Sequence, residues 1–263
     1  MYHDKKLALV TGSTLGIGFA IAEELVNNNA DVIVNGRSKE RVREAVDRIN
    51  SNKGSDTRAI AGVADLSTAE GVELLISRFP EVDVLVNNLG IFEPKPFEDI
   101  TDAEWFKFFE VNVLSGVRLS RHYLPKMLEK DWGRVVFISS ESGIMTPKEM
   151  IHYGVTKSAQ LAVSRGLAEM TAGTSVTVNS VLPGPTASEG VRTFVDQLAK
   201  EGNKTTEEME KEFFRTMRPT SLIKRFAKPE EIAAVVAFVC SPEAAVINGS
   251  ALRAEGGLVQ SII

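Results

Sequence analysis

Short apolar segments rich in β-branched residues recur along the chain, and most of them lack the polar face of a half-exposed strand. They span residues 7–11, 31–35, 57–61, 82–87, 133–139, 175–181 and 250–254. Strands that are apolar on both faces are typical of parallel sheets covered by helices on each side. The pattern therefore predicts about seven parallel strands.

Segments of helical period lie between these strands, and some of them have recognisable first turns. Thr101 and Glu104 form the sequence pattern of a capping box, and Pro229 suits the first turn of a later helix. Alternating strands and helices predict an α/β fold, a doubly wound parallel sheet with helices on both faces. No repeat or linker marks a second unit, so residues 1–263 are expected to form a single domain.

Residues 186–222 differ from the rest because Lys, Glu and Thr are dense there. The apolar positions are spaced for one helical face. They are Val191, Phe194, Val195 and Leu198, followed by Met209, Phe213, Phe214 and Met217. We expect two amphipathic helices that form an insertion over the substrate.

The charge balance excludes some classes of partner. The formal net charge is -5, whereas nucleic acids and anionic membranes usually require a basic face. The chain has no apolar run long enough for a transmembrane span or a secretory signal, so we expect a cytoplasmic protein. The single cysteine, Cys240, is expected to be a buried free thiol, and no histidine spacing predicts a metal site.

A glycine-rich segment follows the first predicted strand and opens a helical pattern. Glycines here allow a tight turn and a close approach to a pyrophosphate, which the helix N-terminus then stabilises. Such turns also close ordinary strand-to-helix connections, but the position at the first of several such junctions favours a dinucleotide site. The expected cofactor-binding residues are Gly12, Ser13, Thr14, Leu15, Gly16, Ile17 and Gly18.

The end of the second predicted strand bears on the choice of cofactor. An NAD-binding protein places a carboxylate here for the ribose 2′-hydroxyl, but this chain has Gly36, Arg37 and Ser38. A guanidinium can bind a 2′-phosphate bidentately, so the sequence favours NADP(H) over NAD(H). A solvated arginine on a loop is the alternative.

Tyr153 and Lys157 are four residues apart in a segment of helical period, thirteen residues after Ser140. Residues at this spacing share one helix face, so the phenol and the ammonium can address one bound group. The pair alone could arise by chance. Its position downstream of a dinucleotide motif gives it significance.

Taken together, the motifs resemble those of the short-chain dehydrogenases/reductases, in the common rather than the extended oxidoreductase subfamily. The resemblance covers essentially the whole chain and implies a Rossmann-like fold. It is carried by Thr11-Gly12-x-x-x-Gly16-x-Gly18, Asn87-Asn88-Leu89-Gly90, Asn112, Ser140, Tyr153-x-x-x-Lys157 and Pro183-Gly184.

The resemblance implies four catalytic residues for hydride transfer between the nicotinamide and a carbonyl or secondary alcohol. Tyr153 would be the general acid or base, and Ser140 would donate a hydrogen bond to the substrate oxygen. Lys157 would hold the nicotinamide ribose, and Asn112 would support a water that relays protons to it. A free tyrosine titrates near 10, and an ammonium about 4 Å away would lower that pKa by roughly one to three units.

The same resemblance implies further cofactor contacts. Asp65 with Leu66 would meet the adenine, although Asp65 could instead cap the helix before Ser67. The remaining positions lie beside the cofactor or on the loop that meets the carboxamide. They are Asn87, Asn88, Gly90, Pro183, Gly184 and Thr186.

One position departs from the family pattern, because Leu89 stands where the family has alanine, and neighbouring groups must make room for it. A second residue, His152, is expected at the solvent surface or the pocket rim. Trp105 and Trp132 fit packing or interface roles.

The substrate pocket is expected to be apolar and to include the 186–222 insertion. Its other predicted members are Phe92, Ser140, Ser142, Ile144, Met145, Ile151 and Tyr153. A 3-oxoacyl thioester, an aliphatic ketone, a steroid or a sugar-derived ketone would all remain possible. The alternatives are a non-catalytic NADPH-binding sensor or scaffold and an NAD-dependent dehydrogenase of the same fold. The resemblance also suggests a homo-oligomer, a homotetramer or dimer, with contacts through residues 102–130 and 151–172.

Overall fold

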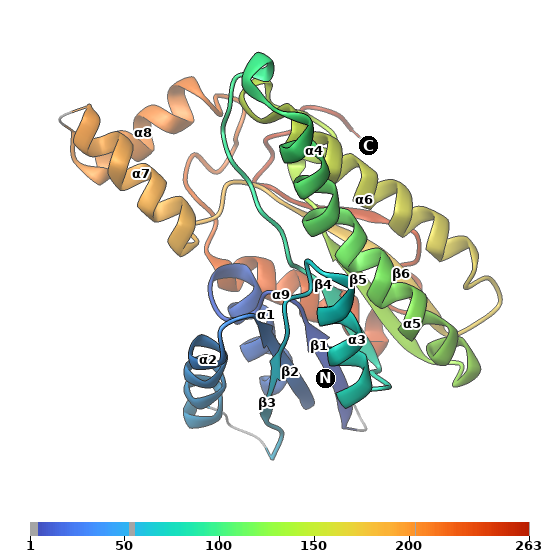
Figure 1. The fold of residues 1–263 in the computed structure, drawn as a ribbon. Helices are drawn as coiled ribbons and strands as arrows, with labels where there is room; N and C mark the ends of the chain where they lie inside the picture. The colour runs from blue at the N-terminus through green and yellow to red at the C-terminus, as the bar shows by residue number, and fades with distance from the viewer. Residues whose placement is uncertain (1–4, 53–55, 203, 263) are drawn as a thin grey trace.

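The parallel sheet predicted from the sequence is present in the computed structural model. The structure describes residues 5–52, 56–202 and 204–262, without the side chains of residues 192, 194, 197, 198 and 201. Within these residues seven strands form one parallel sheet in the order β3-β2-β1-β4-β5-β6-β7 (Figure 1). The strands are β1 (Lys6–Val10), β2 (Ala30–Gly36), β3 (Ala59–Val63), β4 (Val84–Asn87), β5 (Gly133–Ile138), β6 (Val176–Pro183) and β7 (Ala251–Ala254). The predicted doubly wound fold is confirmed.

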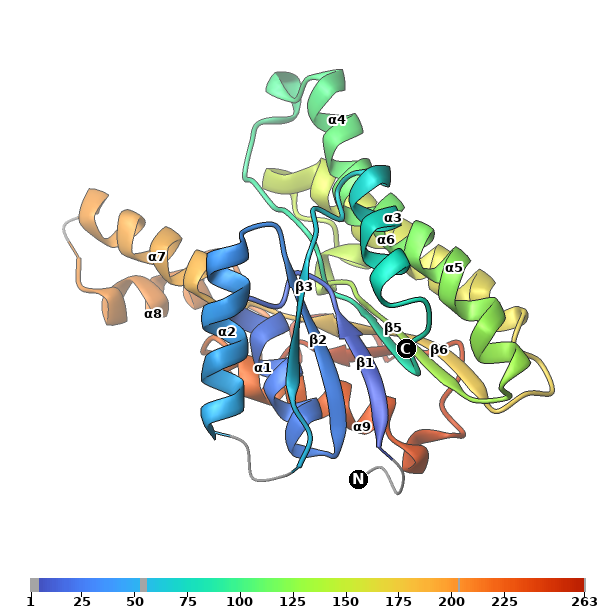
Figure 2. The ribbon, with the colours of Figure 1, turned by 60° about the horizontal axis from the view of Figure 1, so that its bottom comes forward.

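Helices cover both faces of the sheet (Figure 2). One buried cluster joins the sheet to α1, α2 and α9, and a second joins it to α3, α5 and α6. The main helices are α1 (Gly16–Asn27), α2 (Lys39–Asn52), α3 (Ala69–Arg78), α4 (Asp102–Phe109), α5 (Ser115–Glu129), α6 (Ile151–Glu169), α7 (Glu189–Glu201), α8 (Thr206–Thr216) and α9 (Pro229–Cys240). In the described part of the chain, no helix combines the length and the apolar character needed to cross a membrane.

The strand order places the functional crevice. β1 pairs in parallel with β2 on one side and with β4 on the other. The chain therefore winds in opposite directions from β1, and ligands of such sheets bind at the carboxyl ends of the strands on either side of this point. The loops after β1, β4, β5 and β6 meet there.

One strand begins two residues later than its predicted position, because β3 starts at Ala59 rather than at Thr57. The Thr57 hydroxyl donates to the carbonyl of Val26 at 2.7 Å. The Arg58 amide donates to the Asp31 carboxylate at 2.8 Å. These contacts occupy the Thr57 hydroxyl and the Arg58 amide, while the Arg58 carbonyl already accepts the amide of Val32 in β2 at 2.9 Å.

The helical segment after Thr101 contains an irregularity that the sequence pattern did not predict. The capping box of Thr101 and Glu104 is confirmed, but α4 and α5 are separated by a π-helical turn at Glu110–Leu114. Such turns occur mostly as single bulges inside helices and frequently at functional sites. Asn112, expected to be catalytic, lies in this turn.

The insertion contains the two predicted helices, α7 and α8, which project from the body of the protein (Figures 1 and 2). They have a small buried cluster of their own, formed by Val195, Phe213, Phe214 and Phe226. At its base, Thr186 and Ala227 form a parallel β-bridge. The insertion is thus a compact unit, and the residues where the chain enters and leaves it, Thr186 and Ala227, are neighbours.

Two expectations about single residues have opposite outcomes. Cys240 is a buried thiol as predicted, and burial raises its pKa to about 12. The prediction for His152 is wrong, because it is 1% exposed and its ring lies 4.0 Å from that of Phe108 and 6.1 Å from that of Trp105. The packing of α4 against α6 encloses this position, which a residue spacing could not reveal.

Candidate active site

The loop after β1 has the backbone geometry that a pyrophosphate site requires. Gly12 and Gly16 adopt positive φ values of 60° and 59°, a region that favours glycine. A side chain at Gly18 would collide with the side-chain amide of Asn88. That amide donates to the carbonyls of Thr11 and Gly12 at 2.8 and 3.1 Å. Asn88 thus holds the loop, and the free amides at the start of α1 are left for an anion.

The expected loop residues do not all face the crevice. The hydroxyl of Ser13 is fully buried and donates to the carbonyl of Val10 at 2.7 Å. It also accepts the amide of Asn35 at 2.9 Å. Its side chain therefore ties β1 to β2, whereas Thr14 and Ile17 each line a cavity and Leu15 is exposed.

A cavity at the ends of β2 and β3 is where the adenosine half of a dinucleotide would lie. The residues of its lining that the sequence predicted are Gly12, Thr14, Arg37, Ser38, Asp65 and Leu66. Leu89 also lines the cavity. Two further lining residues, the cations Arg41 and Lys107, were not predicted. Arg37 and Arg41 are both exposed, so their guanidinium groups are available to an anion. Leu66 is 1% exposed, so its contribution comes from the backbone rather than the side chain.

Asp65 makes a local turn in addition to facing this cavity. Its Oδ1 accepts the hydroxyl of Ser67 at 2.6 Å and the amide of Ser67 at 3.1 Å. The Ser67 hydroxyl chiefly lowers the pKa of Asp65, and the positive charge of Arg37 lowers it further. The cap of α3 is Thr68, so the alternative interpretation of Asp65 as the helix cap is wrong.

The second cavity lies at the ends of β4, β5 and β6, and it brings together most of the residues expected to bind substrate and nicotinamide. These are Asn88, Gly90, Phe92, Ser140, Ser142, Tyr153, Lys157, Pro183, Gly184 and Thr186. Phe92 packs edge-on against Tyr153, with ring centroids 6.3 Å apart. A side chain at Gly184 would meet the backbone of Glu255, which explains the glycine where the loop leaves β6.

The two neighbouring serines after β5 have different partners. Ser139 donates its hydroxyl to the carbonyl of Lys157 at 2.9 Å and thereby fixes α6 against the strand. Ser140 accepts the amide of Ser142 at 3.1 Å and donates to the carboxylate of Glu141 at 2.5 Å. Both serines line the cavity, but only the Ser140 hydroxyl forms a hydrogen bond with Tyr153.

Tyr153 and Lys157 lie on one face of α6, with the ammonium 5.5 Å from the centroid of the phenol ring. The prediction that the ammonium lowers the pKa of Tyr153 is wrong for this structure. Burial raises the pKa of Tyr153, the charge of Glu141 raises it further, and a hydrogen bond with Ser140 lowers it. The ammonium donates instead to the carbonyl of Ile138 at 2.9 Å.

Asn112 connects to Lys157 through a residue that the sequence analysis missed. The side-chain amide of Asn112 bridges to the carbonyl of Ile91 and to the Thr156 hydroxyl, each at 3.0 Å. The main-chain carbonyl of Asn112 accepts the side-chain amide of Gln160 at 2.5 Å, and the side-chain carbonyl of Gln160 accepts the Lys157 ammonium at 3.2 Å. Gln160 lies one helical turn after Lys157, a spacing that could have identified it.

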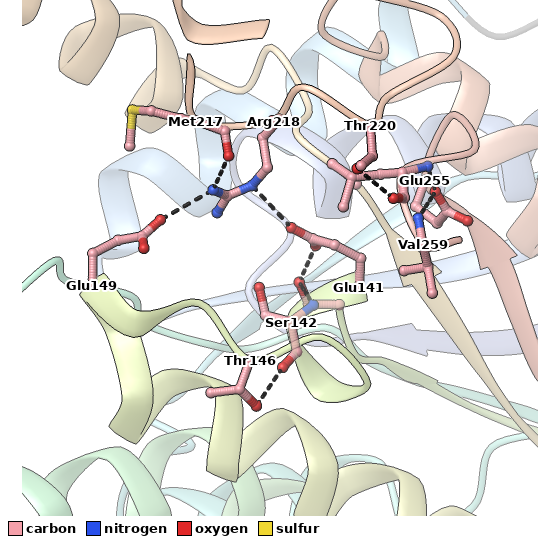
Figure 3. A network of polar contacts seen from close by, with 12 residues as sticks. Glu141, Ser142, Thr146, Glu149, Met217, Arg218, Thr220, Glu255 and Val259 are labelled. Carbon is pink, nitrogen blue, oxygen red and sulfur yellow. Dashed lines mark hydrogen bonds and ion pairs between the residues drawn. The ribbon is translucent and has the colours of Figure 1, made fainter. Parts of the chain in front are cut away.

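Three charged residues of the substrate-end cavity were also missed: Glu141, Glu149 and Arg218. Figure 3 shows the guanidinium of Arg218 between the two carboxylates. It lies 3.0 Å from Glu149 and 3.8 Å from Glu141. Burial raises the pKa of Glu141, while the Ser140 hydroxyl and the Arg218 charge lower it. No sequence spacing links these residues, because they come from three separate segments.

Some expected pocket residues lie elsewhere. Ile144 and Met145 are 46% and 39% exposed and do not line the cavity, because their amides both return to the carbonyl of Glu141 in a tight turn. Ile151 is also outside the lining, and Phe214 packs within the insertion while Phe213 faces the cavity. The side chain of Phe194 lies outside the described residues.

Comparison with known proteins agrees with this geometry. A sequence profile described as short chain dehydrogenase matches residues 6–200. The chain belongs to the short chain dehydrogenase family. The uncharacterized oxidoreductase YvaG from Bacillus subtilis strain 168 is 52% identical over 257 residues, which cover 98% of this chain and 97% of the relative. The chain is thus an oxidoreductase of a family that typically uses NAD(P).

More distant relatives have defined activities. The 3-oxoacyl-(acyl-carrier-protein) reductase of Aquifex aeolicus is 31% identical over 255 residues, covering 96% of this chain and 97% of the relative. The crystal structure of L-sorbose reductase from Gluconobacter frateurii, complexed with NADPH and L-sorbose, aligns with a TM-score of 0.92 and 29% identity and covers 98% of each chain.

Proposed function

We propose that this short chain dehydrogenase is an NADP(H)-dependent oxidoreductase that interconverts a carbonyl compound and a secondary alcohol. The observation that carries the proposal is the meeting of Ser140, Tyr153 and Lys157 at one cavity, at the end of the crevice that begins with the glycine loop. Two hydroxyls and an ammonium at this point can bind and protonate a carbonyl oxygen.

Each residue has a distinct role in the proposed reaction. When bound, the nicotinamide supplies or accepts the hydride, and the protein handles the oxygen. Tyr153 gives its hydroxyl proton to the carbonyl oxygen during reduction and takes it back during oxidation. Ser140 would orient the same oxygen by a hydrogen bond once its hydroxyl proton, which Oε2 of Glu141 accepts in this structure, turns to the substrate. Lys157, which Gln160 connects to the main-chain carbonyl of Asn112, would hold the nicotinamide ribose.

The residues present fit the proposed cofactor. The glycine loop and the start of α1 would hold the pyrophosphate, and Pro183, Gly184 and Thr186 would face the carboxamide. Arg37 and Arg41 form a cationic edge of the adenosine-end cavity, which favours a 2′-phosphate. The solved L-sorbose reductase, with which this chain shares its fold, contains NADPH and supports this choice.

The test is turnover by the purified full chain. NADPH, and separately NADH, would be incubated with a panel of ketones, keto sugars and 3-oxoacyl thioesters, and the loss of reduced nicotinamide followed by absorbance. Oxidation of NADPH that depends on a carbonyl substrate supports the proposal. Tight NADPH binding without turnover of any class would favour the alternative of a non-catalytic sensor or scaffold, and a preference for NADH would indicate the NAD-dependent alternative.

Removal of the Arg37 guanidinium should weaken NADPH specifically. We expect Arg37→Ala to lower kcat/KM for NADPH by about 10- to 100-fold, because a charge-assisted phosphate contact contributes about 1.5–3 kcal/mol. The value for NADH should change by less than about threefold, because NADH has no phosphate there. Arg43→Ala, an exposed position on α2 outside the cavity, is the matched control. Equal losses for both cofactors would contradict the assignment.

The α7–α8 insertion is proposed to be a lid that substrate orders. Its helices pack mainly on each other, while Val191, Phe213 and Met217 face the substrate-end cavity. Limited proteolysis should therefore cut residues 189–216 several-fold more slowly when NADPH and a ketone substrate are both present. Equal cleavage rates with and without these ligands would exclude a ligand-ordered lid.

A further inference from the structure

The wall of the substrate-end cavity next to Ser140 carries an ion pair whose members do not satisfy each other. The Nε atom of Arg218 is 3.8 Å from Oε1 of Glu141. That separation is too long for a direct hydrogen bond, which ends near 3.2 Å between nitrogen and oxygen. A donor and an acceptor therefore stand side by side at the cavity, with a gap between them.

The other carboxylate oxygen of Glu141 and the Nη1 atom of Arg218 both have hydrogen-bond partners. Oε2 of Glu141 accepts the Ser140 hydroxyl at 2.5 Å. The Nη1 atom of Arg218 donates to Glu149 at 3.0 Å and to the carbonyl of Met217 at 2.9 Å (Figure 3). Both side chains are largely buried, with 11% of Arg218 and 8% of Glu141 exposed. The gap is thus a fixed feature of the wall.

A hydroxyl group has the chemistry to bridge this gap. It can accept from Nε of Arg218 and donate to Oε1 of Glu141, and two hydrogen bonds of about 2.8 Å span a separation of this size. An alkyl group in the same place would exclude water from both charged groups without forming a hydrogen bond to either, which is unfavourable. Since Glu141 is also bonded to Ser140, a bridging hydroxyl would lie close to the substrate carbonyl.

We propose that Glu141 and Arg218 form a subsite for a substrate hydroxyl, and that the substrates are hydroxyketones and the corresponding diols or polyols. Simple aliphatic ketones and acyl thioesters would leave the pair unfilled. The inference rests on the proposed function, because it names the substrate class of that same site. Phe92, Val191 and Phe213, which also line the cavity, would contact the carbon skeleton.

The experiment compares two ketones of equal size, hydroxyacetone and butan-2-one, which differ by a hydroxyl in place of a methyl group. For the wild-type enzyme with NADPH we expect kcat/KM to favour hydroxyacetone by about 10- to 100-fold, the range for a hydrogen bond to a charged group. Arg218→Met and Glu141→Gln should each reduce this ratio by at least about fivefold. Hydroxyacetone is intrinsically the more reactive ketone, so the change in the ratio, not its absolute value, measures the subsite.

If Arg218 and Glu141 had only a structural role, their replacement would lower kcat/KM for both ketones by the same factor. An unchanged ratio of the two values in the variants would therefore overturn the proposal. Arg218→Met is the more informative variant, because Arg218 does not touch Ser140. Lys148→Met, exposed and adjacent to Glu149, is the control and should keep the wild-type ratio.

The wild-type enzyme gives an answer that does not depend on folding of the variants. A preference for butan-2-one, or for a 3-oxobutyryl thioester of N-acetylcysteamine, would overturn the hydroxyl subsite and leave the proposed reductase function standing. Absence of turnover with every carbonyl class would instead remove the proposed function, and the subsite with it.

Discussion

Replacing Tyr153 with phenylalanine is expected to lower kcat/KM for carbonyl reduction by about 10²- to 10⁴-fold, the usual contribution of a positioned general acid. The phenol is the proposed proton donor in the cavity, and burial and Glu141 raise its pKa, so it is protonated at neutral pH. That state suits an acid for reduction. The initial rate of NADPH oxidation with the best ketone measures the effect.

Tyr123→Phe is the matched control. Tyr123 lies on α5, where its hydroxyl donates to the carbonyl of Phe79 at 2.8 Å, away from both cavities. Losing this hydrogen bond should cost about 1 kcal/mol of stability and leave kcat/KM within about twofold. NADPH binding, followed by fluorescence, should survive in both variants. Activity of Tyr153→Phe within about threefold of the wild type would exclude the phenol as the proton donor.

The approximate number of strands and their parallel direction could be predicted because they depend on local pattern. A segment apolar on both faces must be covered on both sides, and the alternation with helices leaves few topologies. The start of β3 could not be predicted in the same way. It depends on Asp31 and Asn50, whose side chains bind the amides of Arg58 and Ala59 at 2.8 and 2.9 Å.

The candidate site likewise contains residues that could be selected from the sequence and contacts that could not be predicted from it. Ser140, Tyr153 and Lys157 were selected from their spacing together with the family resemblance, and the fold brings them to one cavity. The Glu141–Arg218 contact joins the loop after β5 to the segment after α8, and only the fold reveals it. The same holds for the environment of a residue. The four-residue spacing predicts that Lys157 and Tyr153 lie on the same face of the helix. It does not predict that the Lys157 ammonium donates to the carbonyl of Ile138.

Replacing Lys157 with methionine is expected to remove most of the activity and yet to stabilise the protein at pH 7. Lys157 is 4% exposed, and burial lowers its pKa from 10.5 to about 7, although the charge of Glu141 acts in the opposite direction. At about 1.4 kcal/mol per pKa unit, the shift corresponds to a destabilisation on the order of 5 kcal/mol. The lysine hydrogen bonds to Ile138 and Gln160 offset part of it, so we expect a net gain of about 1–3 kcal/mol in the variant.

The pH dependence of this difference has a definite sign. The pKa of Lys157 is lower in the folded protein than the 10.5 of the unfolded chain, so between pH 7 and 10.5 the unfolded chain binds the additional proton. The wild type therefore gains stability as the pH rises through this window. Below about pH 7 it bears the full free-energy cost of burying the Lys157 ammonium. Methionine has no such dependence. The advantage of the variant should shrink by about 1.4 kcal/mol per pH unit and reverse before the window ends.

Urea unfolding of the wild type and Lys157→Met at pH 7, 8 and 9 measures this difference directly. Lys148→Met, a change of the same residue type at an exposed position, should follow the wild type at every pH. A difference that does not vary with pH would show that burial of the ammonium has no energetic cost here. A variant that is more stable and inactive would mean that the enzyme retains a destabilising group at this position because the reaction requires its charge, which is the expected conflict between stability and activity at a catalytic site.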